Sequence, residues 1–133
     1  MSRRSLWAAP LALLLAGPPG AAAAGGEVSF SRAVVPVLRT QCAGCHMTGD
    51  EPGGMKLYPS AAYASLVGVP SADSPLLRVA PGEPEQSYLM HKLEGTHLDV
   101  GGQGAQMPFA QLPLAEETRA VIRQWIEAGA PDN

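Results

Sequence analysis

The sequence predicts a small all-α domain of about four short helices joined by long loops. Apolar residues recur at helical spacing in several short segments, and no region shows the regular apolar and polar alternation of strands. The 133 residues include 15 Gly and 13 Pro, which favour long irregular connections between the helices. The length accommodates one domain.

The first 24 residues have the pattern of a secretory signal peptide. Arg3 and Arg4 precede an apolar stretch from Leu6 to Ala16, and small residues at 22–24 offer a cleavage site before Gly25. The apolar stretch is about half of the ~20 residues that a membrane-spanning helix needs, and no second stretch follows. We therefore expect a cleaved signal at 1–24, an exported domain at 25–133, and no stable membrane insertion after cleavage.

Cleavage of the signal makes the protein more acidic. The full sequence has nine basic and 12 acidic residues and a net charge of −3; loss of Arg3 and Arg4, with every acidic residue retained, gives −5. This balance argues against a polybasic nucleic-acid binder. It favours partners that carry basic docking surfaces.

A first helix is predicted from about Ser31, a possible cap, to Cys42. Pro36 loses a backbone hydrogen bond to Arg32, so either the regular helix begins near Val34, with Pro36 in its first turn, or the helix is kinked. The apolar faces are supplied by Val34, Val35, Val37 and Leu38.

The middle of the chain alternates loops with one short helix. Thr48 to Gly54 contains the turn-forming run Asp-Glu-Pro-Gly-Gly and is predicted to be a loop. Ser60 is expected to cap a helix over 61–67 that Gly68 ends. Leu76 to Pro81 is expected to be extended.

The last third predicts two helices separated by a long loop. Pro84 suits the first position of a helix that runs through Glu94, and Gly95 then ends it. A loop follows from Thr96 to Leu112. The final helix is expected over 114–128, where Thr118, Val121, Ile122 and Trp125 recur at helical spacing before Gly129.

The exported chain has few large side chains with which to fill an interior. Its aromatic residues are Phe30, Tyr58, Tyr63, Tyr88, Phe109 and Trp125. A domain of this size with so much Gly and Pro is expected to be marginally stable without a further component in its core. Tyr63, Tyr88 and Trp125 are interpreted as packing residues, whereas Arg78 and Lys92 are interpreted as solvated charges.

The two cysteines lie in the segment Cys42-Ala43-Gly44-Cys45-His46. This is the Cys-x-x-Cys-His pattern of c-type haem attachment, in which two thiols bind the porphyrin vinyl groups and the adjacent imidazole binds the iron. The motif therefore predicts one covalently bound haem c, with Cys42 and Cys45 as thioether residues and His46 as the proximal iron ligand. For Arg78 and Lys92, neutralisation of the haem propionates is the alternative to a solvated charge.

Three other interpretations of this motif are weaker. A zinc site needs four ligands, and His91 and His97 lie outside the paired spacing of common zinc modules. A thioredoxin-like pair is expected to follow a strand, and the residues before Cys42 do not alternate like one. A structural disulfide would leave His46 unexplained.

Met107 is the favoured sixth ligand of the iron. It precedes Pro108, which biases its backbone toward an extended conformation, and it follows the flexible run Gly101-Gly102-Gln103-Gly104. Such a segment is suited to lie as a strap across the second face of a flat ring. A thioether ligand favours a high reduction potential.

The alternatives to Met107 are Met55, in a Gly-Gly-Met loop, and either His91 or His97, which would give a bis-histidine haem of lower potential. Met47 adjoins the proximal histidine and cannot reach the opposite face of the ring. Met90 lies in an expected helix beside leucines and is interpreted as a packing residue.

The sequence resembles the small class I-like monohaem c-type cytochrome domains of bacteria over most of the exported chain. The resemblance rests on Val35-Pro36-Val37-Leu38 before the haem motif, on 81–89, on Met107-Pro108 and on 122–130. It implies a cytochrome c-like fold whose loops wrap the haem, iron ligation by His46 and Met107, and packing of Trp125 where the last helix meets the first. The chain departs from the pattern at Phe109, where many relatives have a second proline.

The predicted function is electron transfer in the bacterial periplasm by a haem that cycles between ferric and ferrous iron, without enzymatic activity of its own. Redox proteins are the expected partners. The alternatives are a haem domain that binds or senses a small ligand at an open iron position, and a haem subunit of a larger periplasmic oxidoreductase.

Overall fold

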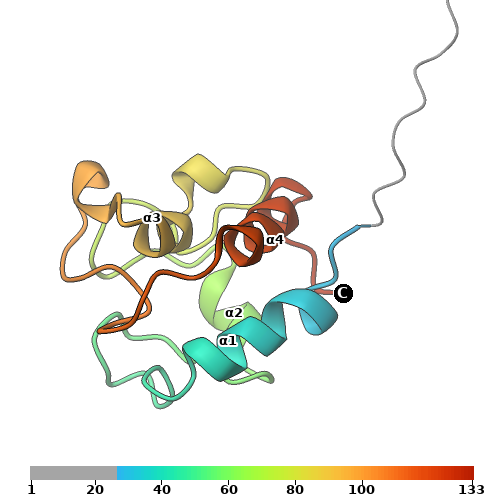
Figure 1. The fold of residues 1–133 in the computed structure, drawn as a ribbon, viewed down its shortest axis with the longest axis horizontal. Coiled ribbons are helices and arrows are strands. Elements are labelled where there is room, and N and C mark those ends of the chain that lie inside the picture. The colour runs from blue at the N-terminus through green and yellow to red at the C-terminus, as the bar shows by residue number, and fades with distance from the viewer. Residues whose placement is uncertain (1–26) are drawn as a thin grey trace, which may run out of the picture.

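The computed structural model describes residues 27–133, which form an all-α fold of short helices and long connections (Figure 1). The predicted signal peptide and its cleavage site lie outside these residues. β-type pairing within 27–133 consists of isolated bridges rather than strands. The elements are the π-helical turn η1 (Phe30–Val34), α1 (Val35–Gln41), α2 (Ala62–Leu66), the 3-10 turn η2 (Pro84–Gln86), α3 (Tyr88–Glu94), the 3-10 turn η3 (His97–Val100) and α4 (Glu116–Glu127).

The first predicted helix is present as η1 followed directly by α1. The Ser29 hydroxyl, rather than that of Ser31, accepts a hydrogen bond from the Arg32 N–H at the start of η1. Pro36 lies in the first turn of α1, where a proline costs no helical hydrogen bond. The regular helix therefore begins near Val34 with Pro36 in its first turn, which is the first of the two predicted alternatives. It ends at Gln41, and Cys42 is its C-cap residue.

Ser60 does not cap α2, and that prediction is wrong. The N-cap residue is Ala61, without a side-chain hydrogen bond. The N–H groups of Ala61 and Ala62 both donate to the Tyr58 carbonyl, at 3.0 Å each. A backbone turn thus satisfies donors that a serine cap would otherwise have bound.

The predicted helix over 84–94 is interrupted at Ser87, so its continuity was predicted wrongly. Ser87 is extended and fully buried, and its hydroxyl donates to the Glu83 carbonyl at 2.9 Å and accepts from the Ala80 N–H at 2.8 Å. Tyr88 N–H pairs instead with the Leu77 carbonyl at 2.8 Å. The segment around Leu77 is extended, as expected. Its pairing with the Tyr88 N–H interrupts the helix at Ser87.

The end of α3 and the limits of α4 agree closely with the sequence pattern. Gly95 adopts the left-handed conformation that ends α3, with φ of 79°. The following loop contains η3, a turn that the sequence pattern did not reveal. α4 starts at Glu116, two residues after the expected start, because Ala115 keeps an extended ψ of 147°.

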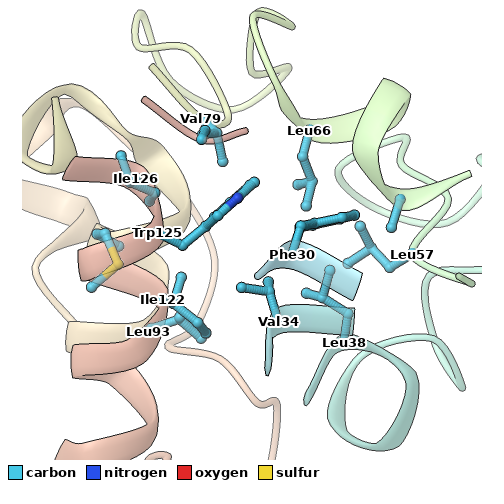
Figure 2. Packing of buried hydrophobic residues seen from close by; sticks show 13 residues of the cluster. Phe30, Val34, Leu38, Leu57, Leu66, Val79, Leu93, Ile122, Trp125 and Ile126 are labelled. Atoms are coloured by element: carbon cyan, nitrogen blue, oxygen red, sulfur yellow. The ribbon is translucent and has the colours of Figure 1, made fainter. Parts of the chain in front are cut away.

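A buried apolar cluster joins the two ends of the chain, with Trp125 of α4 and Phe30 of η1 at its centre (Figure 2). The two rings stack with centroids 4.9 Å apart, and the indole N–H donates to the Pro131 carbonyl at 2.9 Å. The expected packing of Trp125 between the last and first helices is confirmed. The fully buried residues around the pair include Val34, Leu38, Leu66, Val79, Met90, Leu93, Ile122 and Ile126.

The C-terminal residue, Asn133, is hydrogen-bonded to the start of η1. The Phe30 and Ser31 N–H groups donate to the side-chain and main-chain oxygens of Asn133, at 2.6 and 2.9 Å. Figure 1 shows the C-terminus beside the start of η1. Among residues 27–133, no helix has the length and apolar character to cross a membrane.

Candidate functional site

The Cys-x-x-Cys-His motif forms a tight turn at the end of α1. The Cys42 N–H still donates to the Leu38 carbonyl of the helix, at 3.0 Å. The Cys45 and His46 N–H groups both donate to the Cys42 carbonyl, at 3.1 and 3.0 Å. The helix and its terminal turn therefore fix the backbone from which both thiols and the imidazole project.

Both cysteines are free thiols in different surroundings. Cys42 is half-buried against the apolar cluster and Cys45 is exposed. Burial, with a smaller effect from Cys45, raises the pKa of Cys42 to about 11. A thiol with so high a pKa is protonated at neutral pH, which is the opposite of the activated thiolate in a thiol–disulfide redox centre.

The location of the motif also separates it from other cysteine sites. The pair follows a helix, whereas a thioredoxin-like pair follows a strand and opens a helix. Within the described residues there is no cluster of three or more His, Cys, Asp and Glu side chains arranged to hold a metal ion. A zinc site built on His91 or His97 has no support in this geometry.

His46 is half-buried, and its Nδ1 atom is buried without a hydrogen-bond partner. Burial lowers the pKa of His46; Glu51 opposes this effect, and Lys92 and Arg78 add to it. The neutral imidazole is the form that binds a metal. The carbonyl of His46 accepts from the Leu57 N–H at 2.8 Å, which ties the motif to the far end of the following loop.

Arg78 holds the loop that follows the motif and is not the solvated charge predicted from the sequence. Its guanidinium donates to the carbonyls of Gly53, Gly54 and Ser65, at 2.8, 3.0 and 2.8 Å. Its Nε atom is buried without a partner. No local sequence pattern connects an arginine to carbonyls that lie 24 and 25 residues earlier in the chain.

Glu51 organises the other side of this loop. Its carboxylate accepts from the Thr48 N–H at 3.1 Å and from the Gly49 N–H at 2.9 Å. Hydrogen bonds from this turn, with that of Thr48 foremost, lower the pKa of Glu51 to about 2. The loop beside His46 is therefore ordered by a carboxylate at one end and a guanidinium at the other.

Met107 lies on a segment that is hydrogen-bonded along α3. Its N–H donates to the Lys92 carbonyl at 2.9 Å, and the Lys92 ammonium donates to the carbonyls of Gln103, at 3.0 Å, and Ala105. Lys92 is therefore partly exposed, as predicted for a solvated charge, but its ammonium also binds these two carbonyls. Figure 1 shows the segment leaving η3, passing the side where the loop after α1 lies, and returning to α4.

The two histidine alternatives to Met107 differ in how fully they are hydrogen-bonded. His91 is buried, with Nδ1 2.8 Å from the Thr96 hydroxyl and Nε2 3.1 Å from the Glu85 carbonyl. His97 is 4% exposed, with Nε2 2.9 Å from the Gly104 carbonyl. Because a carbonyl only accepts, Nε2 carries the proton in both rings. Both nitrogens of His91 are then engaged, whereas Nδ1 of His97 is buried without a hydrogen-bond partner and keeps its lone pair.

Met55 lies close to His46. A Cβ placed on Gly53 would be 2.8 Å from the Met55 methyl carbon and 3.9 Å from Cε1 of His46. Met55 thus belongs to the loop that packs beside the imidazole. Met107 lies on a different segment, which is held by hydrogen bonds to Lys92 of α3.

The chemistry of these residues, two thiols, an imidazole and a thioether, fits a c-type haem. Cys42 and Met107 both pack half-buried against the apolar cluster, and the unpaired Nδ1 of His46 marks an imidazole whose hydrogen bonding is incomplete in this structure. The positive charge of Lys92 contributes to the lowered pKa of His46. The ligand roles of His46 and Met107 remain predictions.

No family model and no curated protein matches the chain. Among solved structures the chain is similar to one from Kuenenia stuttgartiensis hydrazine synthase, with 25% sequence identity and a TM-score of 0.49. The match covers 77% of this chain and 16% of that chain, so the present chain spans a small part of the length of that protein.

Proposed function

We propose that this protein is a periplasmic electron carrier that holds one covalently bound haem c. The observation that carries the proposal is the turn at the end of α1, where two free thiols adjoin an imidazole of lowered pKa. That combination suits thioether attachment and iron ligation, and it does not suit thiolate redox chemistry.

Cys42 and Cys45 would hold the haem through thioether bonds, and His46 and Met107 would bind the iron from opposite sides. When bound, the haem supplies a reversible one-electron couple between ferric and ferrous iron. The protein contributes ligation, burial and local charge, which are the means by which a fold adjusts such a couple.

Each part of the chain has a positioning role in this proposal. The end of α1 sets the spacing of the three motif side chains, and the Glu51 and Arg78 bonds keep the adjoining loop against the imidazole. The α3 bonds keep Met107 in an ordered segment. With both axial positions filled, the chain would act as a carrier for partner redox proteins rather than as an enzyme.

The test is a spectroelectrochemical titration of the exported protein, combined with carbon monoxide binding to its reduced form. We expect one reversible one-electron transition and slow binding of carbon monoxide, because Met107 must leave first. Met107→Ala, which opens the position, should bind carbon monoxide rapidly. Rapid binding by the native protein would contradict the carrier proposal and favour an open ligand-binding or sensing haem.

A further inference from the structure

Lys92 makes an unusual set of contacts for a lysine on a short helix. Its ammonium donates to the carbonyls of Gln103 and Ala105, while its own carbonyl accepts from the Met107 N–H. One residue of α3 therefore binds three positions within the five-residue segment 103–107. The charge is directed at neutral backbone carbonyls, and no carboxylate lies within ion-pair distance of it among the described residues.

The positive charge of the ammonium strengthens these contacts. Lys92 is half-buried, with its ammonium 5.9 Å from the centre of the Tyr88 ring, and its two hydrogen bonds to carbonyls are exposed. Hydrogen bonds from a charged donor are stronger than those between neutral groups. Lys92 thus combines charged donors with contacts at several positions of this segment.

The segment needs such a restraint because its own composition gives it little stiffness. Gly101, Gly102 and Gly104 lie at or just before its start, and Gly101 and Gly104 have positive φ angles of 72° and 75°. The other bonds to it each hold one position: Tyr88 at Gln103, His97 at Gly104, and the Gln106 side chain at the Leu93 carbonyl. Only Lys92, among these, reaches from 103 to 107.

We propose that Lys92 is a positioning residue that keeps segment 103–107 closed and thereby holds the Met107 sulfur on the iron. The inference rests on the proposed function and extends it, since it assigns the persistence of the sixth ligand to a residue that does not touch the haem iron. Removal of the ammonium should let the segment open more often without detaching the haem.

The test measures how easily imidazole replaces Met107 in the ferric protein. We expect Lys92→Met to bind imidazole about tenfold or more tightly than the native protein, because loss of two charge-assisted hydrogen bonds favours the open segment. Lys92→Arg, which keeps a charged donor, should recover most of the native behaviour. Lys56→Met is the matched control, because within residues 27–133 Lys56 is hydrogen-bonded through its main-chain N–H and not through its ammonium, and it should bind imidazole like the native protein.

A second form of the test removes the charge after folding and so does not depend on whether Lys92→Met folds. The exported chain contains two lysines, Lys56 and Lys92. Acetylation of the folded holoprotein in a Lys56→Arg background therefore modifies Lys92 alone among side-chain amines. Acetylation in a Lys92→Arg background modifies Lys56 and serves as the control.

The outcomes distinguish a failure of this inference from a failure of the proposed electron-carrier function. Tighter imidazole binding after loss of the Lys92 charge, with the native sulfur–iron absorption band present beforehand, supports the inference. Unchanged binding in both Lys92→Met and the acetylated protein overturns it and leaves Met107 ligation standing. Absence of the sulfur–iron band from the native protein overturns Met107 ligation and, with it, the role of Lys92.

Discussion

His46 and Met107 reach their positions through different kinds of backbone support. His46 is placed by a turn of five consecutive residues at a helix end, so the hydrogen bonds that position its backbone are mostly local in sequence. Met107 depends on bonds to Lys92, 15 residues earlier. We therefore expect the attachment side of the site to tolerate changes in the Met107 segment, and the sixth ligand to be the more easily lost.

Met107→Ala should abolish the weak near-infrared sulfur-to-iron band of the ferric protein while the covalent haem is retained. The reason is that the band requires a sulfur ligand: Met55 lies beside His46, and a nitrogen ligand such as the unpartnered Nδ1 of His97 would not give a sulfur-to-iron band. Absorption spectroscopy of the oxidised protein measures the band. Met47→Leu, at a half-exposed methionine outside the proposed ligand set, is the control and should keep it. Persistence of the band in Met107→Ala would reject the ligand assignment.

At the scale of elements, the helices of this chain are short and their ends are fixed by specific hydrogen bonds. Gly95 and Pro84 lie where their conformational preferences put a helix end and a helix start, and the sequence was sufficient to locate both. The break at Ser87 was not predictable, because it depends on pairing with an extended segment about ten residues earlier. The same reason applies to Arg78 and Lys92, whose carbonyl partners are distant in sequence.

Ser87→Ala should lower the free energy of unfolding by about 1–3 kcal/mol, because it leaves the half-buried Ala80 N–H without its acceptor, the hydroxyl of the fully buried Ser87. Denaturant unfolding of the holoprotein measures the change. Ser60→Ala is the matched control, since Ser60 is exposed and caps no helix, and we expect a change within about 0.5 kcal/mol. A larger effect at Ser60 than at Ser87 would contradict the assigned roles.

The loop ordered by Glu51 should loosen in acid. The pKa of Glu51 is about 2 in the folded protein, below its ordinary value of 4.5. A carboxylate with a lowered folded-state pKa stabilises the fold above its unfolded-state pKa, and this stabilisation is lost as the pH falls from about 4.5 through 2. Amide hydrogen exchange at Thr48 and Gly49 should accelerate over that range, relative to the intrinsic rate. In Glu51→Gln the extra acid dependence should be absent; if it remains, another group orders the loop.

At the scale of the whole molecule, the apolar cluster around Trp125 and Phe30 packs α4 against η1, the first described element. The sequence led us to expect an interior short of large side chains. Cys42, Met55 and Met107 are among the half-buried side chains at the edge of this cluster. A flat apolar macrocycle attached at Cys42 and Cys45 is the component we propose to cover this edge.

The general fold and the attachment motif could be predicted because their determinants are local. Helical spacing, Gly and Pro stop signals, and the five residues from Cys42 to His46 each act over a few positions. The hydrogen bonds by which Arg78 and Lys92 hold two loops could not be predicted, because these side chains bind backbone carbonyls, which every residue has. Only the folded chain shows which carbonyls those are.

The most direct test of the central claim is the intact mass of the protein exported to a periplasm that attaches haem c, measured under denaturing conditions together with a reduced-minus-oxidised spectrum. We predict a mass equal to the chain without its signal peptide plus one haem, and a c-type spectrum. The Cys42→Ala, Cys45→Ala double variant should give the mass of the chain alone. A native product with the mass of the bare polypeptide would contradict the account.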